Sequence, residues 1–172
     1  MPMSDYIRSL RNMIGTTLLE VPTVAVLTFD DAGRVLLVRH AEGNDWSTPG
    51  GMIEPYENPS DAAVREMWEE TGLHVELTRL IGVFGGQMCT SRYANGDELS
   101  WVATVFEGKP IDGELRPDGV ETLETRYFAR DETRTLRCKP HVAMFVEAGW
   151  STQRNARFQT PTWRPPMRAG ES

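Results

Sequence analysis

The pattern of apolar and polar positions predicts a chain of short β-strands separated by polar turns. Five runs that are rich in β-branched, aliphatic and aromatic residues are predicted as strands, at residues 23–29, 34–39, 75–81, 99–106 and 122–128. The DDAG segment at 30–33 joins the first two runs, so a hairpin is expected there. Asn95-Gly96 predicts a tight turn between strands, just ahead of the fourth run.

Apolar residues at helical spacing predict one helix before the first strand and one after the last. The first has Ser4 as its N-cap, Ile7, Leu10 and Ile14 on one side, and Gly15 at its end. The last begins at the proline of PHVAMFVEAG and stops at the final glycine of that segment.

A third helix is predicted in the middle of the chain, between the N-cap Asn58 and Gly72, with a proline in its first turn. At about 100° per residue, Glu66, Glu69 and Glu70 fall on one face of this helix. Like charges placed so close together repel one another. The crowding therefore indicates that a positive group belongs among these carboxylates.

Helices and strands alternate without the regular spacing of a doubly wound sheet, which favours an α/β (α+β) fold with a mixed β-sheet between helices. The length of 172 residues fits one domain, assigned to residues 1–150 with the N-terminal helix. Residues 151–172 are an Arg/Pro-rich C-terminal tail. We expect this tail to be mobile; alternatively, it is an arm that docks Phe158 and Trp163 on its own body or on a second subunit.

Composition and charge narrow the classes of function. A net charge of −7 argues against a nucleic-acid polymer as partner, but divalent metals can bridge acidic side chains to a small phosphate ligand. No apolar run reaches the length of a membrane span, and the N-terminus lacks the apolar core of a signal peptide. A cytoplasmic protein without a membrane partner is therefore expected.

The central helix carries the oxygen chemistry of a metal site. Carboxylates, backbone carbonyls and water are the ligands that Mg²⁺ and Mn²⁺ prefer. Upstream, Pro49-Gly50-Gly51 predicts a tight bend that leaves a carbonyl free to point at a ligand. Taken alone, three glutamates on a helix are more often a solvated face, because charge runs are common.

The spacing of the surrounding residues changes this balance. Nine positions at fixed spacing match the Nudix box, namely Gly51, Glu57, Arg65, Glu66, Met67, Glu69, Glu70, Gly72 and Leu73. The sequence thus resembles the Nudix hydrolases over about residues 22–136, with the box as the specific part of the resemblance.

The resemblance implies an α/β/α sandwich in which a loop-helix-loop motif holds one to three divalent cations, Mg²⁺ or Mn²⁺. The corresponding ligands here would be Glu66, Glu69 and Glu70, with the carbonyl of Gly50. A metal would relieve the repulsion among these carboxylates.

The resemblance also implies supporting roles in catalysis. Glu57 would assist through water or through the groups around the metal, and Arg65 would orient a glutamate. The general base is expected to be Glu70 or a glutamate from a downstream loop, for which Glu121 and Glu124 are the candidates.

The implied reaction is hydrolysis of a phosphoanhydride bond in a nucleoside diphosphate linked to another group. The substrate would be a nucleotide-sugar such as ADP-ribose, or a nucleoside triphosphate. One alternative is nucleotide-pool cleansing of damaged nucleoside triphosphates. Another is a non-catalytic nucleotide-sensing module, although such modules typically lose box glutamates that are all present here. Homodimers are common in the family, so the sequence leaves both a monomer and a homodimer as alternatives.

Substrate-binding residues are less well defined by the sequence. Arg39 and His40 end a predicted strand and could contact phosphate or base. Phe84, Arg92 and Tyr93 could line a base pocket, although core packing or surface exposure is about as common for such residues. The residues that mark known substrate subfamilies shortly after the box are absent.

Four further positions complete the prediction. Tyr56 stands where the family often has glycine, and Thr48 stands where a large apolar residue is usual. His74 and His141 show no partner in the sequence and are predicted to be structural or exposed.

Overall fold

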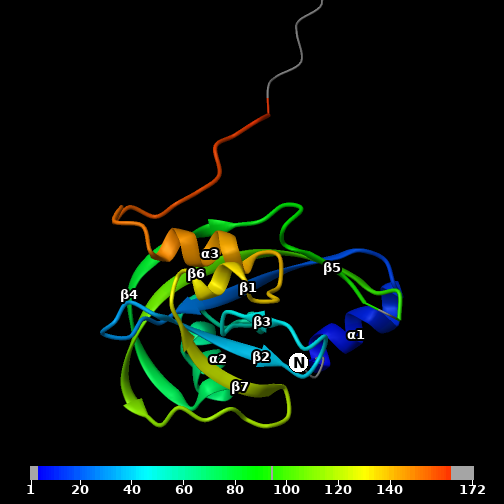
Figure 1. Ribbon diagram of the computed structural model, residues 1–172. Helices are drawn as coiled ribbons and strands as arrows, with labels where there is room; N and C mark the ends of the chain where they lie inside the picture. The colour runs from blue at the N-terminus through cyan, green and yellow to red at the C-terminus, as the bar shows by residue number, and fades with distance from the viewer. Residues whose placement is uncertain (1–3, 94, 164–172) are drawn as a thin grey trace, which may run out of the picture.

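The computed structural model describes residues 4–93 and 95–163 (Figure 1). Its elements in chain order are α1 (Asp5–Ile14), β1 (Leu19–Leu27), β2 (Val35–His40), β3 (Trp46–Ser47), α2 (Pro59–Thr71), β4 (Leu73–Phe84), β5 (Thr90–Arg92), β6 (Glu98–Gly113), β7 (Thr122–Phe128), the 3₁₀ helix η1 (Glu132–Arg134) and α3 (Val142–Gly149). The strands predicted at 75–81, 99–106 and 122–128 all form, the first two within longer strands.

The strands form two sheets. In the larger sheet, β6 pairs in parallel with β1 and antiparallel with β4 and β5. The smaller sheet is antiparallel, with β2 between β3 and β7. Between β5 and β6, the amide of Tyr93 donates to the Asp97 carbonyl and the amide of Gly96 donates to the Tyr93 carbonyl, which confirms the turn predicted at Asn95-Gly96.

The sheets lie between α2 and α3 (Figure 1). Successive residues of a strand point to opposite faces, and residues 24–27 of β1 are buried on both. Val24 and Val26 belong to the apolar cluster that includes α2, whereas Ala25 and Leu27 belong to the cluster that includes α3. The mixed α/β fold with strands between helices is therefore confirmed.

The hairpin predicted between the first two strands is wrong for the strand pairing, and only its turn is confirmed. The DDAG turn forms, because Asp30 accepts hydrogen bonds from the backbone amides of Ala32 and Arg34. A single bridge joins Phe29 to Val35, and the strands then separate into the two sheets. Nine residues of β1 pair with the distant β6 instead, and local turn residues do not encode that non-local pairing.

The terminal helices follow the predicted limits closely. Ser4 caps α1 by accepting a hydrogen bond from the amide of Ile7. Ile14 is exposed, and the buried side chain one turn earlier is Arg11, which donates to backbone carbonyls at residues 15, 17 and 98. Gly149 is the last residue of α3, where a side chain would collide with Leu27. No helix within the described residues is long and apolar enough to cross a membrane.

The C-terminal segment contacts strand β4 of the larger sheet through the Gln153 carbonyl, which accepts from the Arg79 side chain, and through the backbone of Arg157. Arg157 donates its amide to the Ile81 carbonyl and accepts from the amide of Val83, which forms a parallel bridge beside Gly82. Phe158 and Trp163, predicted as docking residues of an arm, are both exposed. The rest of the predicted tail, residues 164–172, lies outside the described residues.

The loop before α2 holds a strained residue. Tyr56 is fully exposed and has a φ of 69°, in the left-handed region that glycine adopts readily. This is the position at which glycine was expected from the family pattern. The tyrosine thus keeps a glycine-like backbone conformation and bears its steric cost.

Replacing Tyr56 by glycine is expected to raise the free energy of unfolding by about 0.5–1 kcal/mol. A left-handed φ costs a residue with a Cβ about 1–2 kcal/mol, and the flexibility of glycine in the unfolded chain offsets part of the gain. Tyr56→Ala is the matched control, because it removes the exposed ring and keeps the Cβ. Urea denaturation measures both variants, and equal stability of the two would contradict the strain.

Candidate active site

Helix α2 directs its glutamates into a groove and buries two of them. Only 4% of Glu66 and 2% of Glu70 is exposed, whereas the Glu69 side chain is 56% exposed. Burial raises the pKa of Glu66 to about 7 and raises the pKa of Glu70 well above its usual range. Two carboxylates therefore sit where ionisation is costly unless a positive charge is nearby.

Arg65 connects four groups of this motif. Its Nε and Nη2 donate to the two carboxylate oxygens of Glu57, at 2.8 and 2.9 Å. Its Nη1 donates to Glu66 at 2.8 Å and to Glu69 at 3.1 Å, and Nη2 also donates to the Met52 carbonyl. These hydrogen bonds keep the pKa of Glu57 below its usual value. The contact between Arg65 and Glu69 joins residues four apart on one face of α2.

Gly50 fixes the loop against β1 and binds Glu70. Its amide donates to Glu70 Oε2 at 3.0 Å. Its φ is 149°, and a Cβ at this position would lie 2.2 Å from the Val24 carbonyl oxygen, so only glycine fits. The carbonyls on either side bind amides of β1, whereas the Gly50 carbonyl accepts no hydrogen bond from the described residues.

The other oxygen of Glu70 is available to a proton or a cation. Glu70 Oε1 is buried and has no hydrogen-bond partner among the described residues. His40 Nδ1 lies 4.0 Å away, but burial, with the charge of Lys139, lowers the pKa of His40 to about 4, so the ring is neutral at neutral pH. A buried carboxylate oxygen without a donor is costly unless a proton or a metal ion binds it.

Glu121 and Asp118, from the segment before β7, complete the acidic groove. The groove is lined by Ser4, Met52, Glu54, Arg65, Glu66, Glu69, Glu70, Asp118 and Glu121. Burial raises the pKa of Glu121, and the charges of Asp118 and Glu69 add to this shift. The sequence prediction missed Asp118, whose Oδ1 accepts from the backbone amides of residues 120–122. Only its position three residues before Glu121 could have indicated it.

To bind a cation in the groove, the carboxylates would have to rotate. Within the described ranges, no three carboxylate, imidazole or thiol groups already converge at metal-ligand spacing. One oxygen each of Glu66 and Glu69 is bound to Arg65, and one oxygen of Glu70 is bound to Gly50. The hard oxygen donors still match the preference of Mg²⁺ and Mn²⁺.

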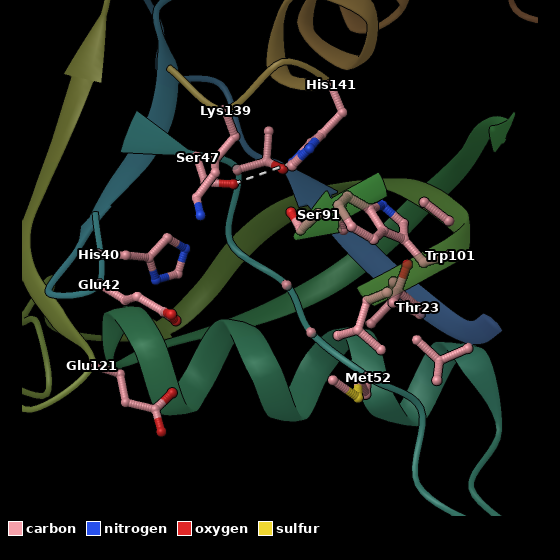
Figure 2. Close-up of a pocket in the computed structure, with 18 of the residues that line it drawn as sticks. Thr23, His40, Glu42, Ser47, Met52, Ser91, Trp101, Glu121, Lys139 and His141 are labelled. Carbon is pink, nitrogen blue, oxygen red and sulfur yellow. Dashed lines mark hydrogen bonds between the residues drawn. The ribbon is translucent and has the colours of Figure 1, made fainter. Parts of the chain in front are cut away.

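A cavity of about 490 Å³ adjoins the acidic groove, and Met52 and Glu121 line both (Figure 2). Its walls come from β1, from β6 with Trp101, and from the loop that carries Tyr93. His40 and Tyr93, two of the predicted substrate-binding residues, line this cavity.

The other predicted substrate-binding residues lie outside both hollows. Arg39 pairs with Glu124 across β2 and β7, with Nη2 3.0 Å from the carboxylate. This pair also places Glu124, a candidate base, away from the groove. Arg92 forms a surface ion pair with Glu98. Phe84 is buried in the core.

The structure adds polar residues that the sequence did not assign to the site, namely Lys139, Ser47 and His141. His141 was predicted to be structural or exposed, but it lines the cavity. Its ring makes a T-shaped contact with Trp101, at 5.5 Å between centroids, and its Nε2 lies 3.4 Å from Ser47 Oγ. These partners are remote in sequence, so no local signal could identify them.

Comparison with known proteins agrees with this arrangement. Residues 19–147 match the NUDIX domain model. A MutT-like protein of Streptomyces ambofaciens is 37% identical over 126 residues, which are 73% of this chain and 75% of that protein. A protein of Bacillus subtilis (strain 168), named as a candidate 8-oxo-dGTP diphosphatase, is 34% identical over 104 residues. These residues are 60% of this chain and 63% of the Bacillus protein.

The fold comparison points the same way. The crystal structure of a MutT NUDIX hydrolase from Burkholderia pseudomallei superposes with a TM-score of 0.64 at 25% identity, covering 76% of this chain and 98% of that chain. The family model spans most of the chain and includes the whole acidic motif of α2. The chain therefore belongs to the Nudix hydrolase family.

Proposed function

We propose that this Nudix hydrolase uses Mg²⁺ or Mn²⁺ to cleave a phosphoanhydride bond in a nucleoside diphosphate linked to another group. The observation that carries the proposal is the junction of two hollows at Met52 and Glu121. One hollow is rich in carboxylates that suit cations, and the other has aromatic walls that suit a nucleoside. A substrate spanning the junction would place its phosphates over the acidic groove.

The residues of the Nudix motif at the groove have proposed tasks. Glu66, Glu69 and Glu70 would hold the cations together with the carbonyl of Gly50. A bound cation neutralises phosphate oxygens and lowers the pKa of a water molecule. Arg65 keeps the carboxylates in place through the hydrogen bonds described above, with Glu57 as its bidentate partner.

The general base is proposed to be Glu121, with Glu70 as the alternative. Glu121 borders both hollows, so it can reach a water molecule between the phosphates and the cavity. Glu70 already accepts from Gly50 and is proposed as a metal ligand. In hydrolysis the base takes a proton from water, the water oxygen bonds to phosphorus, and the bridging oxygen leaves with the other phosphate.

Two substrate classes are proposed for this site. A nucleoside triphosphate, and with it nucleotide-pool cleansing, is favoured by the name of the Bacillus subtilis relative. A nucleotide-sugar is the second class. A panel of both with Mg²⁺ and Mn²⁺, analysed by phosphorus NMR, separates them: pyrophosphate release supports the triphosphate, and two monophosphates from ADP-ribose support the sugar. If no member of the panel were hydrolysed, the result would favour a non-catalytic sensing module. The cytoplasmic location and the homodimer are separate predictions.

Glu70→Gln is expected to keep the fold and lower turnover by roughly 100-fold or more. The amide oxygen of glutamine can still accept from Gly50, but it supplies no charge to a cation. Steady-state kinetics at saturating metal measure the loss, and a thermal melt checks the fold. Glu76→Gln, an exposed site on β4, is the matched control and should behave like the unchanged protein. Near-normal turnover of Glu70→Gln would contradict the assignment.

Stabilisation by metal is expected to grow as pH rises from about 5 to about 8. The raised pKa values of Glu66 and Glu70 mean that folding favours their protonated forms. Their contribution to stability is complete below the ordinary glutamate pKa and is lost as pH rises through about 7 for Glu66. A cation binds the ionised carboxylates, so it offsets this loss mainly at higher pH.

Melting temperatures with Mg²⁺, measured against EDTA-treated protein at each pH, check this prediction. Glu66→Gln should reduce the metal-dependent gain, whereas Glu76→Gln should leave it unchanged. A gain that is the same at both ends of the pH range, or that survives in Glu66→Gln, would argue against cation binding by this groove.

A further inference from the structure

The cavity beside the acidic groove contains a lysine that the proposed hydrolysis does not use. Lys139, in the loop before α3, is partly buried and lines the cavity but not the groove. Within the described part of the chain, its ammonium group makes no hydrogen bond and no ion pair. An ammonium group that has lost part of its water gains from an oxygen on a ligand.

Ser47 offers a second donor at the same end of the cavity. Burial lowers the pKa of His141 to about 4, so its ring is neutral and carries one N–H at neutral pH. Nδ1 is buried without a partner among the described residues, whereas Nε2 faces Ser47 Oγ. Orphaned buried donors are rare, so we assign the proton to Nε2. Ser47 then accepts from His141, and its own hydroxyl hydrogen is left for a ligand.

Aromatic side chains supply the walls for a planar group. Trp101 is steadied by its T-shaped contact with His141, at an interplanar angle of 88°. Burial raises the pKa of Tyr93, so its phenol stays neutral. Figure 2 shows Lys139, Ser47 and His141 together at the top of the view, with Trp101 to one side and Glu121 at the bottom. A base stacked on Trp101 would thus present its edge to the donors, away from the acidic groove.

We propose that Lys139 and Ser47 select nucleotides whose purine carries a carbonyl oxygen at the position where adenine carries an amino group. This inference rests on the proposed function, because it concerns the same site. Lysine can only donate, and the Ser47 hydroxyl is directed to donate as well. A carbonyl oxygen accepts from both, whereas an amino group places donor against donor. A phosphate oxygen is the other acceptor that Lys139 could bind, and the experiment separates the two.

Hydrolysis of ITP and ATP by the full chain with Mg²⁺ tests the proposal, because their bases differ in the 6-oxo and 6-amino groups. We expect kcat/KM to favour ITP by about tenfold or more, since a mismatched site leaves its donors unpaired. Lys139→Met should bring the ratio to within about threefold of unity, through a higher KM for ITP rather than a lower kcat. Lys139→Glu replaces donors by acceptors and should shift the preference toward ATP.

Lys109→Met is the matched control, because Lys109 is an exposed lysine on β6 outside both hollows. It should keep the unchanged ITP preference, and thermal melts confirm that each variant is folded. Equal kcat/KM for ITP and ATP in the unchanged protein would overturn the proposal. So would an equal loss on both nucleotides in Lys139→Met, which is the result expected if the lysine binds phosphate.

Calorimetric binding of IDP and ADP to Glu70→Gln separates this inference from the proposed function. Tighter binding of IDP, lost in the double variant with Lys139→Met, would support base selection even if no nucleotide were hydrolysed. Equal affinity for IDP and ADP alongside normal hydrolysis by the unchanged protein would support the hydrolase and reject the base selection.

Discussion

The burial of carboxylates on the inner side of α2 is the constraint on which the rest of the site depends. The apolar residues of α2 pack on the sheets, and the same helical turns carry Glu66 and Glu70 inward. Buried carboxylates are tolerated only where hydrogen bonds or cations compensate them. Arg65 and the amide of Gly50 supply part of that compensation. Glu70 Oε1 is left without a hydrogen-bond partner among the described residues, which is why we propose a cation for this groove.

Gly50 connects the buried carboxylate of Glu70 to the sheets. Its close contact with Val24 holds the loop against β1, and the neighbouring carbonyls bind amides of the same strand. The loop is thereby fixed relative to α2 on one side and to the aromatic cavity on the other. Groove and cavity therefore meet at a defined junction, on which the proposed binding of a phosphate-linked nucleoside depends.

Local signals predicted the helices, most strands and the carboxylate motif well. The limits of α2 followed from a proline in the first turn and Gly72 after the last, because these residues act through their own backbone. The pairing of β1 with β6 rather than β2 was not predictable in this way, since the two strands are some 80 residues apart. Arg39 and Glu124 were candidates for the site, but their ion pair across β2 and β7 places them outside it.

The sequence by itself determined the reaction class, because the carboxylates, Arg65 and the glycines act at fixed spacing along one loop and helix. Tertiary structure alone decided what surrounds that motif. Trp101 is far along the chain from Lys139 and His141, and these residues meet only when the sheets and α3 pack together. Spacing along a chain encodes local geometry, whereas a binding cavity depends on long-range packing that no short stretch contains.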